Sequence, residues 1–177
     1  MQHKDHVYLL RKGIPEGRGI WADLGSGTGA FTLALADLLG PAGHIYSLDK
    51  DAGSLREQQR AMHSAFPSVS VEYMNTDFTR QLNLPQLDGI LMANSLHYVR
   101  QKEPVLRNLR SHLRPGGRLI IVEYNVDKGN FWVPYPFSYR SWEELAQRSG
   151  FSNTQQLASV PSSWLREIYS ALSLNGA

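Results

Sequence analysis

The stretch that decides the fold is Asp23-Leu24-Gly25-Ser26-Gly27-Thr28-Gly29, in which three glycines at alternate positions follow an acidic residue. It comes at the end of an apolar run, residues 19–24, for which we expect a strand. Apolar residues at helical spacing from Phe31 to Leu38 then predict a helix that begins near Thr28 and ends before Gly40. Glycines adopt positive φ without strain, and the first turn of a helix has free backbone amides. The stretch is therefore typical of a strand–turn–helix unit that binds a ligand against its backbone.

Strands and helices are expected to alternate along the rest of the chain, which is typical of a parallel sheet with crossover helices. The further strands predicted are residues 44–48, 69–74, 87–93 and 118–124, followed by a hairpin of residues 154–160 and 165–172, although residues 164–172 also fit a helix. Helices are expected after the cap Asp51, near Pro104 as far as Pro115-Gly116-Gly117, and from a capping box of Ser141 with Glu144. We predict one α/β domain over residues 1–177, a doubly wound, mostly parallel sheet of about seven strands with one antiparallel strand near its C-terminal edge.

The composition and charge of the sequence exclude several classes of protein. The 177 residues are 42% hydrophobic and 19% charged, as in ordinary globular proteins, and a net charge of +2 lacks the one-sided excess of a typical nucleic-acid binder. There is no cysteine, which excludes disulfides and thiolate chemistry. The six histidines have no metal-ligand spacing, so no metal site is expected, and all except His97 are expected on the surface (His3, His6, His44, His63 and His112). The sequence has no apolar run of membrane-spanning length and no signal-peptide pattern, which predicts a cytoplasmic protein.

A second acidic residue indicates the kind of ligand. Asp49 ends the second predicted strand about 20 residues after the glycine turn, where a carboxylate can accept hydrogen bonds from ribose hydroxyls. Gly25, Gly27 and Ala30 also satisfy the dinucleotide pattern G-x-G-x-x-A, but the chain has no room for a second nucleotide-binding half. The Asp23 carboxylate suits an ammonium group better than a pyrophosphate. S-adenosylmethionine has such an ammonium group and no phosphate, so the pattern favours this methyl donor over NAD.

Five blocks occur in order along the chain: residues 23–29, Asp49, Asn75-Thr76-Asp77-Phe78, Asn94-Ser95-Leu96-His97-Tyr98 and Leu113-Arg114-Pro115-Gly116-Gly117-Arg118. In these blocks the sequence resembles the class I S-adenosylmethionine-dependent methyltransferases, in the branch that includes the quinone-biosynthesis C-methyltransferases and many small-molecule enzymes. The resemblance implies that Gly25, Gly27 and Gly29 line the donor and that Asp49 binds the ribose. It also implies that Asp77 binds the adenine amino group with Phe78 beside the ring, and that Asn94 lies near the methionine end. Asp23, Ser26, Thr28 and Lys50 complete the expected donor site.

Three residues are candidates for catalysis. His97 falls where class I enzymes place groups that face the transferred methyl, and a histidine, with an ordinary pKa of about 6.5, can take a proton at neutral pH. A purely structural role for His97 is equally compatible with the sequence. Tyr98 follows it, and Glu123 comes near the end of the fifth predicted strand, at the expected acceptor rim. Residues 125–140 are rich in aromatic side chains, which favours a lid over an apolar acceptor but also fits a packed loop.

The function predicted is methyl transfer from S-adenosylmethionine to a small-molecule acceptor by direct in-line displacement. One alternative is a methyltransferase for tRNA or protein, but residues 94–97 read Asn-Ser-Leu-His and lack the Asn-Pro-Pro-Tyr type motif of amino-directed nucleic-acid enzymes. Another is a donor-binding regulatory module without turnover, and a nicotinamide oxidoreductase is a third. The acceptor, the methylated atom and the oligomeric state are left open by the sequence.

Overall fold

The computed structural model of the chain describes residues 1–15 and 17–176. Seven strands form one sheet in the order β3-β2-β1-β4-β5-β7-β6. Their bounds are β1 Gly19–Leu24, β2 Gly43–Asp49, β3 Ser70–Asn75, β4 Leu87–Ala93, β5 Leu113–Tyr124, β6 Phe151–Pro161 and β7 Glu167–Asn175. β1 to β5 pair in parallel, and β7 is antiparallel to both β5 and β6. The doubly wound, mostly parallel sheet of seven strands with one antiparallel strand is therefore confirmed.

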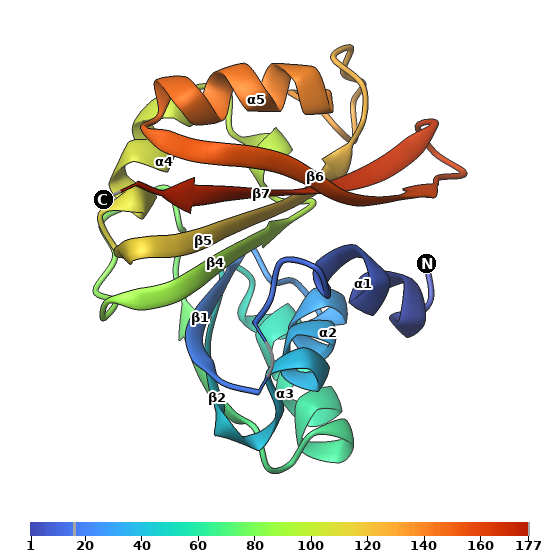
Figure 1. Cartoon of the computed structure of the whole chain (residues 1–177). Helices are drawn as coiled ribbons and strands as arrows, with labels where there is room; N and C mark the ends of the chain where they lie inside the picture. The colour runs from blue at the N-terminus through green and yellow to red at the C-terminus, as the bar shows by residue number, and fades with distance from the viewer. Residues whose placement is uncertain (16, 177) are drawn as a thin grey trace.

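Helices cover both faces of this sheet (Figure 1). The α-helices are α1 His3–Leu10, α2 Ala30–Leu39, α3 Ala52–Ala65, α4 Lys102–Arg110 and α5 Tyr139–Arg148, with short 3₁₀ turns at Gly40–Ala42 and Leu96–Tyr98. α1, α2 and α3 pack against one face, in a core that includes Trp21 and Ile45. α4 and α5 pack against the other, where Leu106 and Trp142 are fully buried. The apolar rows of the sheet are thus buried on both sides, as expected for a parallel sheet.

The order of the strands in the sheet indicates where a ligand can bind. β1 lies between β2 and β4, so the chain leaves β1 toward one edge of the sheet for β2 and β3 and toward the other edge for β4 and β5. Loops that follow neighbouring strands on either side of such a switch point diverge, which opens a crevice at the carboxyl ends of the strands. The glycine turn after β1 and the segment that begins at Asn94 after β4 therefore meet at this crevice.

Several local predictions were wrong at the ends of elements. α2 begins at Ala30 and not near Thr28, because Gly29 before it is left-handed, with φ 94°. The N-cap of α5 is Ser138, whose hydroxyl accepts a hydrogen bond from the Ser141 amide, so the capping box from Ser141 to Glu144 does not form. Pro115-Gly116-Gly117 lies inside β5, where the register with β4 shifts, and does not simply close α4. By contrast, the predicted C-terminal hairpin is confirmed as β6 and β7, so the alternative of a helix over residues 164–172 is excluded.

The N-terminal helix α1 was not predicted. It buries Leu9 and Leu10 against α2 and the last two strands, and the Ser170 hydroxyl of β7 donates to the Leu9 carbonyl at 2.6 Å. His6, expected on the surface, is buried on the same helix with its ring 4.5 Å from the ring of Phe31. α1 is therefore part of the folded domain, and its contacts come from segments far away in the sequence.

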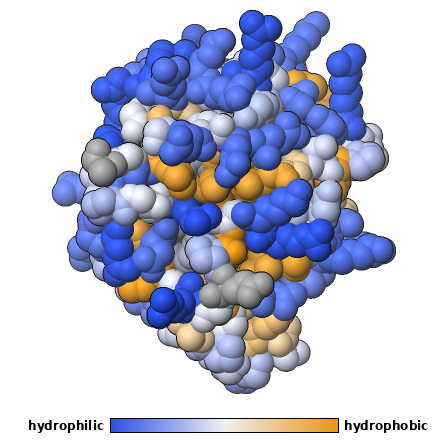
Figure 2. Space-filling view, viewed as in Figure 1, coloured by the Kyte–Doolittle hydropathy of each residue, from blue (hydrophilic) through white to orange (hydrophobic). Residues whose placement is uncertain are grey.

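Hydrophilic side chains cover much of the face drawn in Figure 2, especially over α5, while a band of hydrophobic side chains crosses its middle at the level of β5 and β7. Within the part of the chain that the structure describes, no helix has the length and apolar character needed to cross a membrane.

The packing of α1 predicts a stability effect. Leu10→Ala should lower the free energy of unfolding by about 2–5 kcal/mol, because it leaves a cavity between α1, α2 and the sheet. Urea denaturation followed by circular dichroism measures the change, with the exposed Lys4→Ala on the same helix as the control. Equal unfolding midpoints for the two variants would show that α1 does not contribute to the fold.

Candidate active site

The glycine turn after β1 is held tightly at both ends and is open in the middle. Gly25, Gly27 and Gly29 all have positive φ, at 74°, 55° and 94°. A Cβ at Gly25 would lie 2.6 Å from the Cβ of Ser95, and one at Gly29 would overlap the Gln58 side chain. A Cβ at Gly27 would meet no atom of the described chain within 4 Å. Glycine is thus required for packing at the two ends, while the backbone at Gly27 faces free space that a ligand can occupy.

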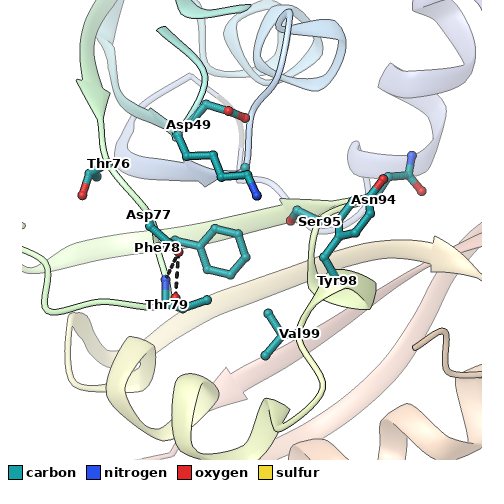
Figure 3. A pocket seen from close by; sticks show the side chains of 11 residues that line it. Asp49, Thr76, Asp77, Phe78, Thr79, Asn94, Ser95, Tyr98 and Val99 are labelled. Atoms are coloured by element: carbon teal, nitrogen blue, oxygen red, sulfur yellow. Dashed lines mark hydrogen bonds between the residues drawn. The ribbon is translucent and has the colours of Figure 1, made fainter. Parts of the chain in front are cut away.

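A cavity of about 460 Å³ opens beside this turn. It is lined from four strand ends, by Gly25 after β1, Asp49 and Lys50 after β2, Thr76, Asp77, Phe78 and Thr79 after β3, and Asn94, Ser95, Tyr98 and Val99 after β4. In Figure 3 the Phe78 ring points toward the middle of the cavity, with Asp49 at one side and Ser95 and Tyr98 on the opposite wall. A flat apolar ring with carboxylates nearby is a suitable environment for a nucleoside.

Two carboxylates in this cavity are fixed by backbone donors. Asp49 Oδ2 accepts a hydrogen bond from the Gly27 amide at 2.7 Å, and Oδ1 accepts one from the Asp51 amide at 2.8 Å. Asp77 Oδ1 accepts from both the amide and the hydroxyl of Thr79, and these two bonds lower the pKa of Asp77 below its ordinary value. The Asp49 carboxylate is thereby tied to the glycine turn itself.

Asp23 occupies a different environment. It is only 1% exposed and lines a second cavity of about 430 Å³ together with the glycine turn, His6 and Phe31. The pKa of Asp23 is raised to about 7, mainly by burial and also by the charge of Asp49. The hydrogen bond that its Oδ2 accepts from the Thr32 hydroxyl at 2.6 Å acts in the opposite direction. A cationic group bound in this cavity would favour the ionised carboxylate.

Asn94 connects the cavities. It lines the first and the second, and also a third of about 220 Å³. Its backbone is left-handed, with φ 51°, and its amide donates to the Val122 carbonyl at 2.8 Å. Its side-chain Oδ1 is buried and has no hydrogen-bond partner among residues 1–15 and 17–176. Because buried acceptors are nearly always paired in folded proteins, this orphaned oxygen fits a ligand that donates a hydrogen bond at the junction.

The third cavity is lined by two of the three candidate catalytic residues, His97 and Tyr98. Its lining, besides Asn94, is made of His97, Tyr98, Tyr124, Trp132, Val133 and Trp164. His97 Nδ1 lies 2.7 Å from Glu123 Oε2, and Glu123 Oε1 accepts from the amides of Leu96 and His97 at 3.1 and 3.2 Å. Glu123 is 0% exposed and lies behind the histidine, not at the acceptor rim. The carboxylate therefore fixes the ring and leaves Nε2 as the nitrogen available on the cavity side.

The aromatic segment after β5 contains both exposed and buried rings, and its role as a lid stays a prediction. Phe131 and Trp132 are 88% and 65% exposed, whereas Phe137 is buried against Trp142 in the core. The Asn130 side chain accepts from the amides of Trp132 and Val133, and the Tyr135 amide donates to the carbonyl of His97 at 3.0 Å. The segment is thus anchored at both ends, and its exposed Trp132 lines the third cavity.

The structure brings most of the predicted site residues together at one end of the sheet. Gly25, Asp49, Lys50, Asp77, Phe78 and Asn94 line the first cavity, and Asp23, Ser26, Gly27, Thr28 and Gly29 line the second. His97 and Tyr98 line the third, and Glu123 contacts it only through His97. Sequence reasoning did not select His6 and Trp164, because neither belongs to a local motif. Ser95 was quoted within a block but not selected, although its hydroxyl donates to the Leu24 carbonyl at 2.7 Å and closes the turn.

Comparison with known proteins agrees with this geometry. Residues 22–119, more than half of the chain, match the family described as "Methyltransferase domain". The ubiquinone/menaquinone biosynthesis C-methyltransferase UbiE of Pseudomonas savastanoi pv. phaseolicola is 31% identical over 105 residues, which are 58% of this chain and 41% of that protein. The reducing polyketide synthase grgA of a Penicillium species is 28% identical over 165 residues, 80% of this chain and 7% of that protein. The chain thus spans well under half the length of these relatives.

A solved S-adenosylmethionine-dependent methyltransferase from Aquifex aeolicus has the same fold, with a TM-score of 0.74 and 17% identity over 96% of this chain and 89% of that one. The fold is thus that of a solved S-adenosylmethionine-dependent methyltransferase, and the family match defines the class as methyltransferases. The chain belongs to the methyltransferase domain family.

The open face of the glycine turn predicts a selective binding defect. Gly27→Ala should cost about 1–2 kcal/mol of stability from the left-handed backbone, and it should weaken S-adenosylhomocysteine binding at least about tenfold, because the new methyl group occupies ligand space. Gly116→Ala is the matched control, since it also has positive φ and no atom within 4 Å but lies in β5 outside the three cavities. Calorimetry and thermal melts on both variants make the comparison, and equal affinities would remove Gly27 from the donor site.

Proposed function

We propose that this chain transfers the methyl group of S-adenosylmethionine to an activated carbon of a small, largely apolar molecule, with residues 1–177 acting as one domain. The observation that carries the proposal is the His97–Glu123 pair, whose histidine lines a cavity that shares Asn94 and Tyr98 with the proposed donor cavity. A cytoplasmic location stays a prediction.

The donor is proposed to lie across the first two cavities. Asp49 accepts hydrogen bonds from the ribose hydroxyls, and Asp77 and Phe78 hold the adenine. The Asp23 carboxylate receives the ammonium group in the second cavity, where the amides of the glycine turn are also available. Asn94, at the junction, then lies next to the sulfur. When bound, S-adenosylmethionine supplies a methyl group on a positively charged sulfur, open to in-line attack from the third cavity.

His97 is proposed as the base that prepares the acceptor. A carbon nucleophile must lose a proton to attack, and His97 Nε2 can take it while Nδ1 stays bonded to Glu123. The buried Glu123 carboxylate stabilises the imidazolium that results and keeps the ring oriented, so it is a positioning residue. Relatives named as C-methyltransferases support transfer to carbon.

The lining of the third cavity supports a small apolar acceptor. Tyr98, Tyr124, Trp132 and Trp164 provide aromatic surface, and Val133 closes one wall. Aromatic faces offer apolar contacts against which such an acceptor can be aligned with the methyl group. The aromatic walls and the histidine pair also support an enzyme over a donor-binding module without turnover.

Removal of the base should separate catalysis from binding. His97→Ala should lower turnover by about 100- to 10,000-fold while leaving the affinity for S-adenosylhomocysteine within about twofold, because His97 lines only the acceptor cavity. Glu123→Gln should also lower turnover, since it removes the charge that stabilises the imidazolium. Formation of S-adenosylhomocysteine with a panel of 1,3-dicarbonyl and hydroquinone compounds measures turnover.

His63→Ala serves as the control, because His63 is exposed on α3 away from the three cavities. Turnover of the His97→Ala variant at the rate of the control would exclude His97 as the base. A product methylated on oxygen or nitrogen would contradict the proposal that carbon is the acceptor atom.

The exposed rings predict an effect on the acceptor alone. Trp132→Ala should raise the KM for the acceptor, because the ring forms part of the cavity wall, and should leave donor affinity and thermal stability nearly unchanged. Steady-state kinetics and thermal melts measure both. Phe137→Ala is the contrasting variant, since its buried ring predicts a loss of about 3–5 kcal/mol in stability. A large fall in stability for Trp132→Ala with an unchanged KM would contradict an acceptor role.

A further inference from the structure

A chain of buried polar side chains runs beneath the glycine turn. The Thr32 hydroxyl of α2 donates to Asp23 Oδ2 at 2.6 Å, and the Gln58 side-chain amide of α3 donates to Thr32 Oγ1. Gln58 Oε1 accepts a hydrogen bond from the Ser47 hydroxyl of β2 at 2.7 Å, and Ser47 Oγ lies 2.7 Å from Ser26 Oγ in the turn. These hydrogen bonds join side chains of β1, the glycine turn, α2, β2 and α3.

When Asp23 is ionised, these hydrogen bonds can have only one order of donors and acceptors. Each hydroxyl has a single hydrogen to donate. The Thr32 hydrogen goes to Asp23, so Thr32 must accept from the Gln58 amide. Gln58 Oε1 can only accept, so it takes the single Ser47 hydrogen, and Ser47 Oγ lies 2.7 Å from the Ser26 hydroxyl, whose own hydrogen is free to complete the series. The opposite direction would need a protonated Asp23 and a turned Gln58 amide. With Asp23 ionised, the Gln58 amide donates to Thr32 and the Thr32 hydroxyl donates to Asp23 Oδ2, so Gln58 and Thr32 together favour the acceptor form of Asp23.

The location of Gln58 is unusual for a glutamine. It lies on the buried face of α3 between Leu55 and Met62 and is 0% exposed, where an amphipathic helix normally places an apolar residue. Buried amide groups cost stability unless they are hydrogen-bonded. Its side chain also fills the space that a Cβ at Gly29 would need. Gln58 thus contacts the turn by packing and Asp23 through Thr32.

We propose that Gln58 is a positioning residue for methyl-donor binding, which acts on the Asp23 carboxylate through the Thr32 hydroxyl. The inference rests on the proposed function, because it assumes that Asp23 receives the ammonium group of the donor. With Oδ2 held by Thr32, the other carboxylate oxygen is left to the ligand in the second cavity. The hydrogen bond from Thr32 favours the charged carboxylate against the effect of burial.

Other titratable groups around Asp23 come from different elements. Asp49 at the end of β2 raises the pKa of Asp23, and His6 of α1 lines the same cavity. Burial lowers the pKa of His6, and the charge of the amino group at Met1 adds to this effect. None of these groups belongs to the chain of hydrogen bonds, so their contributions stay the same when Gln58 or Thr32 is changed.

The experiment measures the Kd of S-adenosylhomocysteine by calorimetry between pH 6 and pH 8. Binding to the unchanged protein should tighten as pH rises through the pKa of Asp23, about 7, because an ammonium group binds the ionised carboxylate. Gln58→Met and Thr32→Val should move this midpoint upward by about one pH unit, which is a roughly tenfold higher Kd at pH 6.5 with a difference that narrows toward pH 8.

Two controls test the mechanism. Thr32→Ser keeps the hydroxyl and should restore the original midpoint, and Gln59→Met changes the exposed neighbour on α3 and should leave it unmoved. A merely structural role for Gln58 would lower the melting temperature and raise the Kd equally at every pH, which would overturn the inference. An unmoved midpoint in Thr32→Val would overturn it as well. Failure of the unchanged protein to bind S-adenosylhomocysteine would instead overturn the proposed donor site, and with it the inference.

Discussion

The close approach of three segments to one turn constrains the whole site. Between β1 and α2 the backbone is left-handed at three alternate glycines, with Ser95 packed against the first and Gln58 against the last. No side chain fits at these two points, so the segment after β4 and the helix α3 both come within van der Waals distance of the turn backbone. The carboxylate of Asp49 and the amide of Gly27 then fix the end of β2 to the same turn.

Three cavities meet at Asn94 as a result of this packing. The first lies toward β2 and β3, the second lies under the turn toward α1, and the third lies toward β5 and the β6–β7 hairpin. In the proposed placement, a donor that spans the first two cavities presents its methyl group to the third, where Glu123 holds the His97 ring. In the proposed function, the groups that bind the donor and the proposed base lie in different cavities, so alignment and proton removal would fall to separate side chains. The hydrogen-bonded side chains that end at Asp23 lie beneath the proposed donor site and do not reach the third cavity.

The parts of the fold that depend on local pattern could be predicted from the sequence. The strand before the glycine turn, the cap at Asp51 and the carboxylate at Asp49 all follow from residues within a few positions of one another. The parts that depend on distant contacts could not. Trp164 reaches the third cavity only because the β6–β7 hairpin folds back beside β5, and α1 is stabilised by its packing on α2 and the last strands. The burial of Gln58 could not be predicted either, because the apolar stripe of α3 is weak and only the orientation of that helix in the fold decides which glutamine is buried.

A crystal structure of the chain with S-adenosylhomocysteine tests the central claim most directly, because it fixes both the donor and the direction from which the acceptor approaches. The account predicts adenine against Phe78, ribose hydroxyls on Asp49, the ammonium group at Asp23, and the sulfur beside Asn94 with its open side toward His97. A product bound with its sulfur turned away from the cavity that His97 lines, or with its ribose away from Asp49, would contradict the account.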